Sequence, residues 1–246
     1  MPQHTLLGAA IPTGYGSITP VSGEVKNPKR NVPLAVVTVI LLGGSLAALD
    51  IYAVADHIIY VGGGSSMLQL IADRFGLLTL AFVFFAALND GILATLAFMV
   101  ATSRTIYAMS YHGFLPSLFN KVHAKSGPLY AGLAAIGLYA VALYPIVATA
   151  PDLSTAFTTM GFLAMLANTV VHVSANLSLL RISLKRISKR WWELALSVAA
   201  TVLTTYIALQ SIGGIQPGIV STFMGLIVLG FLVAEAREMI LEGEEE

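Results

Sequence analysis

The 246-residue chain has a formal net charge of zero, and 57% of its residues are apolar while only 11% are charged. A soluble domain carries about 25% charged residues, so this composition excludes a water-soluble globular domain, and the zero net charge gives no reason to expect a nucleic-acid partner. The absence of cysteine excludes disulfides, thiolate chemistry and zinc–cysteine sites.

Seven apolar segments predict a polytopic, all-α integral membrane protein. A hydrocarbon core of about 30 Å requires about 20 apolar residues per helix, and the charged residues are clustered so that such runs lie between them. The stretch 62–76, which begins with three glycines, is too short to span and predicts a short helix that dips at the outer surface. In chain order, the predicted spans cover about residues 6–25, 33–55, 77–101, 129–148, 155–180, 194–212 and 219–236.

Lysine and arginine residues follow the odd-numbered spans, and Arg74 alone lies on the other side of the membrane. Because cytoplasmic loops carry an excess of basic residues, we expect a multi-pass plasma-membrane protein with its N-terminus outside and its acidic C-terminus in the cytoplasm. The predicted organisation is a single membrane domain, residues 1–246. It comprises a broken helix with a cytoplasmic loop (1–32), two spans with the outer short helix and a cytoplasmic loop (33–128), two spans with a basic loop (129–190), and two spans with an acidic tail (191–246).

The first span is predicted to be broken, because proline removes a backbone donor and clashes with the preceding helical turn. Pro20 fits only if a new helix starts just before it, with Ser17 or Thr19 as its cap. About nine residues then remain to the end of the span, or about 14 Å at 1.5 Å per residue, which puts the break near the bilayer midplane. The interrupting residues are Pro12, Gly14, Gly16 and Pro20.

Two interpretations of this break are open. Backbone groups without helical partners are tolerated at membrane depth only inside protein or facing a watery cavity. The second half-helix would direct its positive N-terminal end at the midplane, where it could hold a carboxylate. The break is then part of a binding site. In the other interpretation, it is a kink that neighbouring helices accommodate.

Polar residues inside two other spans also allow two interpretations each. Asp90, beside Asn89, lies midway along the third span, where a charge costs at least about 2.5–3.5 kcal/mol on insertion scales. It serves either in proton coupling or cation contact, or as a buried or protonated side chain bonded to a neighbouring helix. Asn168, His172 and Asn176 share one face of the fifth span, which favours interhelical hydrogen bonds over an aqueous path.

Glu24 at the end of the first span and a pair of small residues within the second allow further predictions. Glu24, near the cytoplasmic end of the first span, either forms a gating ion pair with Arg104 or Lys26 or is an exposed helix-end charge. Gly43 and Ala47 on the second span have the small-xxx-small spacing that lets another helix approach closely. That spacing indicates packing and not chemistry.

Two stretches resemble signatures of the amino acid–polyamine–organocation (APC) transporters. The sequence GYGS at residues 14–17, followed by EVKNPKRNVP at 24–33, is similar to the sixth-helix signature of that family. Residues 103–128 look like the end of its eighth helix and the following cytoplasmic loop. The matching positions there are Ser103-Arg104, Tyr107-Ala108-Met109, GFLP at 113–116, Phe119, Val122-His123 and Gly127-Pro128.

The resemblance implies the LeuT-like fold of two inverted five-helix repeats and two further helices, with the seven predicted spans as helices 6–12. Helices 1–5 have no counterpart in this sequence; either a separately encoded N-terminal half supplies them as a partner, or the sequence starts too late. The resemblance further implies secondary transport of amino acids or related amines across the bilayer, driven by a proton, sodium or exchange gradient. No enzymatic activity is expected, and no cofactor beyond a coupling proton or Na⁺.

The resemblance also assigns roles to particular residues. Many relatives carry an acidic residue where Gly16 stands, so a neutral amino acid is the expected substrate. Phe98 aligns where relatives place an aromatic side chain near substrate, with a packing role as the alternative. No catalytic or metal-binding residue is expected. The candidates are Thr13, Gly14, Tyr15, Gly16, Ser17 and Phe98 for substrate, Asp90 and Asn89 for ion or proton coupling, and Glu24 and Arg104 for a cytoplasmic gate.

The sequence gives little support to the functions that compete with transport. An intramembrane aspartyl protease needs two carboxylates close enough to share a proton, but Asp50 lies at a different depth from Asp90. A metal site needs clustered histidines and carboxylates. The histidines are instead scattered over His4, His57, His112, His123 and His172.

A truncated or structural membrane subunit of the same fold that does not transport is the alternative function.

Overall fold

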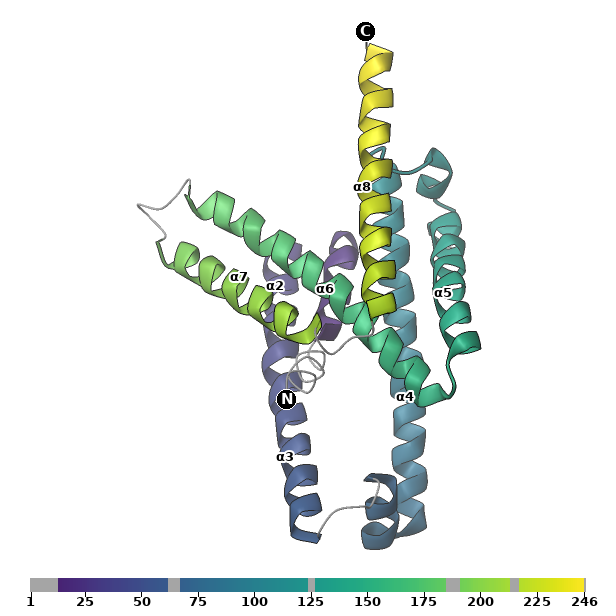
Figure 1. Ribbon diagram of the computed structural model, residues 1–246, viewed down its shortest axis with the longest axis vertical. Coiled ribbons are helices and arrows are strands. Elements are labelled where there is room, and N and C mark those ends of the chain that lie inside the picture. The colour runs from purple at the N-terminus through teal and green to yellow at the C-terminus, as the bar shows by residue number, and fades with distance from the viewer. Residues whose placement is uncertain (1–12, 62–66, 124–126, 185–190, 213–216, 246) are drawn as a thin grey trace. The chain divides into compact units, whose positions relative to one another are not determined.

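The computed structural model describes residues 13–61, 67–123, 127–184, 191–212 and 217–245, and nearly all of them are helical (Figure 1). Among these residues the only β-type pairing is an isolated antiparallel bridge between His123 and Gly127. The chain forms two compact units, one of residues 11–139 and the other mainly of residues 140–246. The all-α fold class predicted from the sequence is confirmed, and the single membrane domain stays a prediction.

The unit of residues 11–139 contains six helical elements and the first part of a seventh. A 3₁₀ helix packs against both α2 and α4, and a second short 3₁₀ helix packs against α4. A π-helical turn, η2, joins α2 and α3 without interrupting the helical backbone, since the residues on either side of it are in the α-helical conformation. In order, the elements are η1 (Thr13–Glu24), α2 (Pro28–Thr38), η2 (Val39–Gly43), α3 (Gly44–Val61), α4 (Met67–Tyr111), η3 (Ser117–Asn120) and the start of α5 (Leu129–Thr149).

The unit of residues 140–246 contains the end of α5 and three long helices. Figure 1 shows α6 and α7 side by side, and α6 also contacts α8. Leu166 on α6 and Phe223 on α8 are buried and form a small apolar cluster. Partly buried apolar residues of the same two helices pack against this cluster. The helices are α6 (Leu153–Leu184), α7 (Trp191–Ile212) and α8 (Pro217–Glu245).

A described helix lies at each of the six spans predicted after the first one, but α7, at the predicted span 194–212, is not among those long and apolar enough to cross a membrane. Four of the described helices are long and apolar enough to cross a membrane: Pro28–Asp56, Leu68–Tyr111, Leu129–Thr149 and Leu153–Leu184. A shorter apolar helix covers Val220–Ala236. Large apolar side chains are exposed along these helices, as expected for surfaces that face lipid or other membrane helices instead of water.

The glycine at position 76 divides α4 into two helices. Gly76 has φ 81° and ψ 171°, outside the helical region, a conformation that glycine adopts at little cost because it lacks Cβ. Residues 67–75 therefore form a separate short helix, as predicted, and residues 77–111 form a long one (Figure 1). The long helix continues ten residues beyond the predicted end of the span at 101, because hydropathy marks the end of an apolar run and not the end of a helix.

The C-terminus of α4 is closed by a glycine motif. Gly113 has φ 81°, its N–H donates to the Ser110 carbonyl at 3.1 Å, and the Phe114 N–H donates to the Met109 carbonyl at 2.8 Å. This pair of bonds is the Schellman arrangement, which satisfies the last carbonyls of a helix. The Ser110 hydroxyl also donates to the Pro116 carbonyl at 2.7 Å and holds the following turn.

The first segment is non-α, as its glycines and prolines predict, but the predicted restart capped by Ser17 or Thr19 is wrong. A 3₁₀ helix runs from Thr13 to Glu24 straight through Pro20. The proline φ of about −65° suits a 3₁₀ helix, and the missing N–H removes a single bond. The residues before Thr13, which include Pro12, lie outside the described residues.

Candidate functional site

Five of the six candidate substrate residues occupy the first five positions of η1, and the sixth, Phe98, lies on α4. Gly14 and Gly16 are exposed, while Tyr15 and Ser17 are half-buried. A Cβ atom built on either glycine meets no atom within 4 Å. The backbone of η1 is therefore open to a ligand at both positions, and a side chain added there would occupy free space.

Two hydroxyl groups on η1 bond to the carbonyls of the open glycines. The Ser17 Oγ donates to the Gly14 carbonyl at 2.8 Å, and the Thr19 Oγ1 donates to the Gly16 carbonyl at 3.1 Å. Bonds of this kind offer the backbone an alternative to regular helical partners. They explain how a segment with two glycines and an internal proline keeps a defined helical path.

The candidate coupling residues lie in the middle of α4, on a part of that helix that the described residues leave uncovered. Every residue from 84 to 98 is exposed, including Asn89, Asp90 and Phe98. Thr95 donates its hydroxyl to the Gly91 carbonyl at 2.7 Å within the helix. The described residues therefore bury neither Asp90 nor Phe98.

The structure does bring Glu24 and Arg104 together. The Arg104 Nε donates to Glu24 Oε1, and the two side chains form an ion pair. The side chain of Arg104 is 26% exposed and that of Glu24 is 57% exposed, so water reaches the pair. Of the two cations considered for Glu24, the geometry selects Arg104 and not Lys26. The pair joins the C-terminal end of η1 to α4, and its function as a gate stays a prediction.

A tight turn follows Glu24 and leads into α2. Asn27 has φ 50°, a left-handed conformation that asparagine tolerates better than most residues. The Asn31 side-chain amide donates to the Lys26 carbonyl, and Pro28 occupies the first turn of α2, where its missing N–H costs no helical bond. The turn fixes where η1 ends and so where Glu24 lies.

Small residues hold the C-terminal half of α4 against the start of α5. Ser103 is 6% exposed, and its Oγ would lie 3.7 Å from a Cβ built on Gly132. The Thr102 and Tyr139 hydroxyls share a hydrogen bond at 2.9 Å. Because Thr102 and Ser103 directly precede Arg104, this packing fixes the backbone from which Arg104 reaches Glu24. The sequence showed these residue types but could not pair positions so far apart.

The polar stripe on α6 is half-buried in the second unit. Asn168, His172 and Asn176 are each partly covered, on the helix that packs against α7 and α8. Ser183 on α6 and Ser197 on α7 are fully buried, as small side chains are where two membrane helices approach closely. The choice between interhelical hydrogen bonds and an aqueous path for this stripe stays a prediction.

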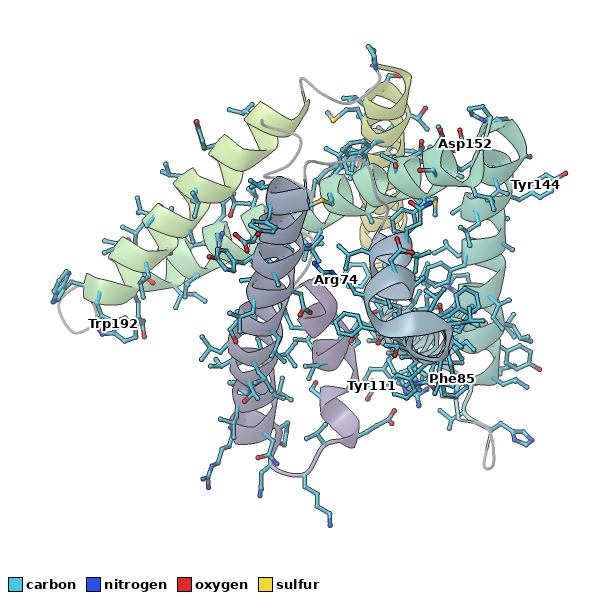
Figure 2. All side chains as sticks on the ribbon, turned by 90° about the horizontal axis from the view of Figure 1, so that it is seen from below. Arg74, Phe85, Tyr111, Tyr144, Asp152 and Trp192 are labelled. Atoms are coloured by element: carbon cyan, nitrogen blue, oxygen red, sulfur yellow. The ribbon has the colours of Figure 1, made fainter. Side chains whose placement is uncertain are left out.

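Asp152 caps the start of α6. Figure 2 shows it at one end of that helix, with Trp192 of α7 near the other end. Its carboxylate accepts hydrogen bonds from the Thr155 backbone N–H at 2.8 Å and from the Thr155 hydroxyl at 3.0 Å. These bonds stabilise the charged form and lower the pKa of Asp152 below its ordinary value.

The cap predicts a pH-dependent stability. Because the pKa of Asp152 is lower in the folded protein, its contribution is complete at neutral pH, above the ordinary aspartate value of about 3.9, and is lost as the pH falls through the folded value. We expect Asp152→Ala to lower the thermal unfolding temperature of the detergent-solubilised protein at pH 7, with the difference shrinking in acid. Asp152→Asn, which keeps a capping side chain without this titration, is the control. A difference between wild type and the alanine variant that is independent of pH would contradict this account.

A cavity of about 360 Å³ lies beside this cap. None of its lining residues is charged, and the hydroxyls of Thr149, Thr155 and Thr222 donate to the Pro145 carbonyl, the Asp152 carboxylate and the Gly218 carbonyl. Its hydroxyls are thus largely used within the fold. The lining residues are Ile146, Thr149, Ala150, Pro151, Thr155, Thr159, Leu163, Gly218 and Thr222.

Comparison with known proteins identifies one family. A family model described as "Amino acid permease" matches residues 8–234. The match begins in the first predicted span and ends in α8, so it contains every candidate site residue and both stretches that carry the resemblance. No curated protein and no solved structure gives a match.

Proposed function

Because the chain belongs to the amino acid permease family, within the APC superfamily, and is a multi-pass membrane protein that transports amino acids, we propose that it carries out secondary active transport of neutral amino acids across the plasma membrane. The observation that carries the proposal is the open backbone at Gly14 and Gly16 on a non-α membrane segment. Binding sites of secondary transporters are built at such irregular segments, where backbone groups and helix ends face the substrate.

The lengths of η1 and α4 support a common depth for the substrate and coupling residues. From Glu24 back to Gly14 is ten residues of 3₁₀ helix, or about 20 Å at about 2.0 Å per residue. From Arg104 back to Asp90 is fourteen residues of α-helix, or about 21 Å at 1.5 Å per residue. In the proposed topology both segments run from the outside to the cytoplasm, and the Glu24–Arg104 pair aligns their cytoplasmic ends. Gly14 and Asp90 are therefore at the same level in the bilayer.

The charge on η1 favours a neutral substrate. Glu24 is the only charged residue between Thr13 and Glu24, and its carboxylate pairs with Arg104. No carboxylate remains on this segment for the second amino group of a cationic amino acid or polyamine. The substrate carboxylate, by contrast, needs only backbone donors at the positive end of a helix.

Asp90 supplies the ion-coupling group in this proposal, with Asn89 beside it. A charge near the bilayer centre is stable only when other protein groups or water cover it, and the described residues leave α4 exposed on all sides from 84 to 98. Helices 1–5 of the family's fold, which the resemblance places in an N-terminal half, provide the covering helices and the rest of the substrate site. Phe98 lies two turns from Asp90 towards the cytoplasm, and in this proposal its ring covers the cytoplasmic side of the substrate site.

The Glu24–Arg104 pair is the cytoplasmic gate of the proposed cycle. It links η1, which carries the substrate residues, to α4, which carries the coupling residues. An exposed ion pair contributes only about 0–1 kcal/mol. Such a pair biases a conformational equilibrium between closed and open states without locking it, as a gate that opens in every cycle requires.

Uptake of radiolabelled amino acids by proteoliposomes tests the function. Vesicles that contain the chain with its N-terminal half are expected to accumulate neutral amino acids against a gradient when a proton or sodium gradient is imposed, and to exclude lysine and putrescine. Vesicles with the chain alone are the control. Preferential uptake of a cationic substrate would refute the neutral specificity, and facilitated equilibration that ignores both ion gradients would refute secondary active transport.

A further inference from the structure

Gly127 lies against the guanidinium group of Arg104. A Cβ atom built on Gly127 would be 3.7 Å from Arg104 Nη1 and 3.9 Å from Nη2. Gly127 is one of three glycines with positive φ among the described residues. The other two, Gly76 and Gly113, have nothing within 4 Å of a built Cβ. At Gly127 alone among the three, a side chain would project towards a functional group.

Backbone hydrogen bonds hold Gly127 in place. It exchanges two of them with His123, with its N–H donating at 2.9 Å and its carbonyl accepting at 2.8 Å, and its carbonyl also accepts from the Leu129 N–H at 2.9 Å. α5 begins at Leu129 and is held on α4 by the Thr102–Tyr139 bond and the contact of Ser103 with Gly132. Gly127 is thus fixed relative to the backbone of Arg104, and its φ of 64° keeps it there.

The two sides of the guanidinium group therefore meet different surroundings. Nε donates to Glu24, while Nη1 and Nη2 lie over the bare backbone of Gly127. We propose that Gly127 is a positioning residue for the cytoplasmic gate: it leaves free the space in which Arg104 turns towards Glu24, and it offers no competing side chain. This inference rests on the proposed gate and adds to it a residue that contacts neither substrate nor Glu24.

Gly127→Asp is the informative substitution. Aspartate tolerates positive φ better than most residues, and its carboxylate would lie within reach of Nη1 and Nη2 and draw Arg104 away from Glu24. Gly113→Asp is the matched control, because Gly113 has φ 81° and open space around it, so the same backbone and charge change occurs without a contact with Arg104. Gly127→Asn places an uncharged side chain of the same size at the same backbone conformation.

The absence of cysteine from the chain provides a direct readout. A single cysteine introduced as Gly16→Cys lies on the exposed side of η1, and a membrane-impermeant maleimide added to the cytoplasmic side of inside-out vesicles reports whether the gate is open. Glu24→Gln, which removes the ion pair, is expected to raise the labelling rate about two- to fivefold, the range that an exposed pair supports. The same transporter without the introduced cysteine corrects for labelling elsewhere.

Gly127→Asp is expected to raise labelling as much as Glu24→Gln, Gly127→Asn less, and Gly113→Asp not at all. Glu24→Gln combined with Gly127→Asp should match either single variant, because both act on one interaction. Increased labelling by Gly113→Asp, additive effects in the double variant, or unchanged labelling by Gly127→Asp would each overturn the role of Gly127 while leaving the gate intact. Unchanged labelling by Glu24→Gln would overturn the gate itself. Size-exclusion profiles identify variants that misfold. If Gly127→Asp misfolds, the labelling of Gly127→Asn is compared with that of the wild type instead.

Discussion

Replacing Gly14 with leucine is expected to abolish amino-acid uptake while the protein remains inserted in the membrane. The structure leaves open space at this position, so the side chain does not collide with the fold, and leucine is favourable in membrane insertion. It instead fills the space proposed for substrate. The expected loss is at least about tenfold, because even one methylene changes discrimination in an apolar pocket by about 10–200-fold. Uptake by proteoliposomes is the measurement, normalised to the amount of reconstituted protein.

Two variants make the result specific. Gly14→Ala adds one carbon and should retain part of the uptake. Gly137→Leu adds the same side chain at an exposed glycine of α5 that also has nothing within 4 Å, and should transport normally. Uptake by Gly14→Leu at the wild-type rate would remove η1 from the substrate site, and equal losses in Gly14→Leu and Gly137→Leu would show a general effect of added bulk.

Replacing Asp90 with asparagine is expected to remove the dependence of uptake on the driving ion. The amide has nearly the same shape as the carboxylate, but it can neither take up a proton nor balance the charge of a cation. If protons drive transport, the ratio of uptake at about pH 5.5 to that at about pH 7.5 should fall to about one in the variant. If sodium drives it, replacing sodium by choline should no longer change uptake.

Asp73→Asn is the matched control for this experiment. Asp73 lies on the short helix before Gly76 and is exposed, so the same charge is removed outside the proposed site. If uptake by the Asp90→Asn variant depends on pH and cation as uptake by the wild type does, Asp90 has a packing role and not a coupling role. Altered profiles in both variants would point to a general effect of net charge on the vesicles.

The positions of the membrane helices could be predicted because the length of an apolar run follows from the thickness of the bilayer. The ends of the helices were harder to predict, since hydropathy reports where an apolar run ends and not where its helix stops. Residues 102–111 show the difference, because they continue α4 in a more polar sequence. The conformation of η1 was missed for another reason: the rules for proline in an α-helix do not apply to a helix that bonds three residues apart.

The candidate site was predictable only where residues lie near each other in the chain. Gly14 and Gly16 share one segment, so their composition alone suggested an irregular backbone. Glu24 and Arg104 are 80 residues apart, and the sequence left Lys26 as an equal partner for Glu24. Gly127 belonged to a matching stretch but had no assigned role, because its contact with Arg104 depends on how α5 begins.

The π-helical turn between α2 and α3 changes how substitutions along residues 28–61 should be interpreted. A π turn contains one residue more than an α turn, so side chains after Gly43 are rotated by about 100° from the face that an uninterrupted α-helix would present. Positions that align on a single helical wheel before Val39 and after Gly43 therefore point in different directions. A cysteine scan of this segment should show two phases of accessibility, one for residues 28–38 and another for residues 44–61.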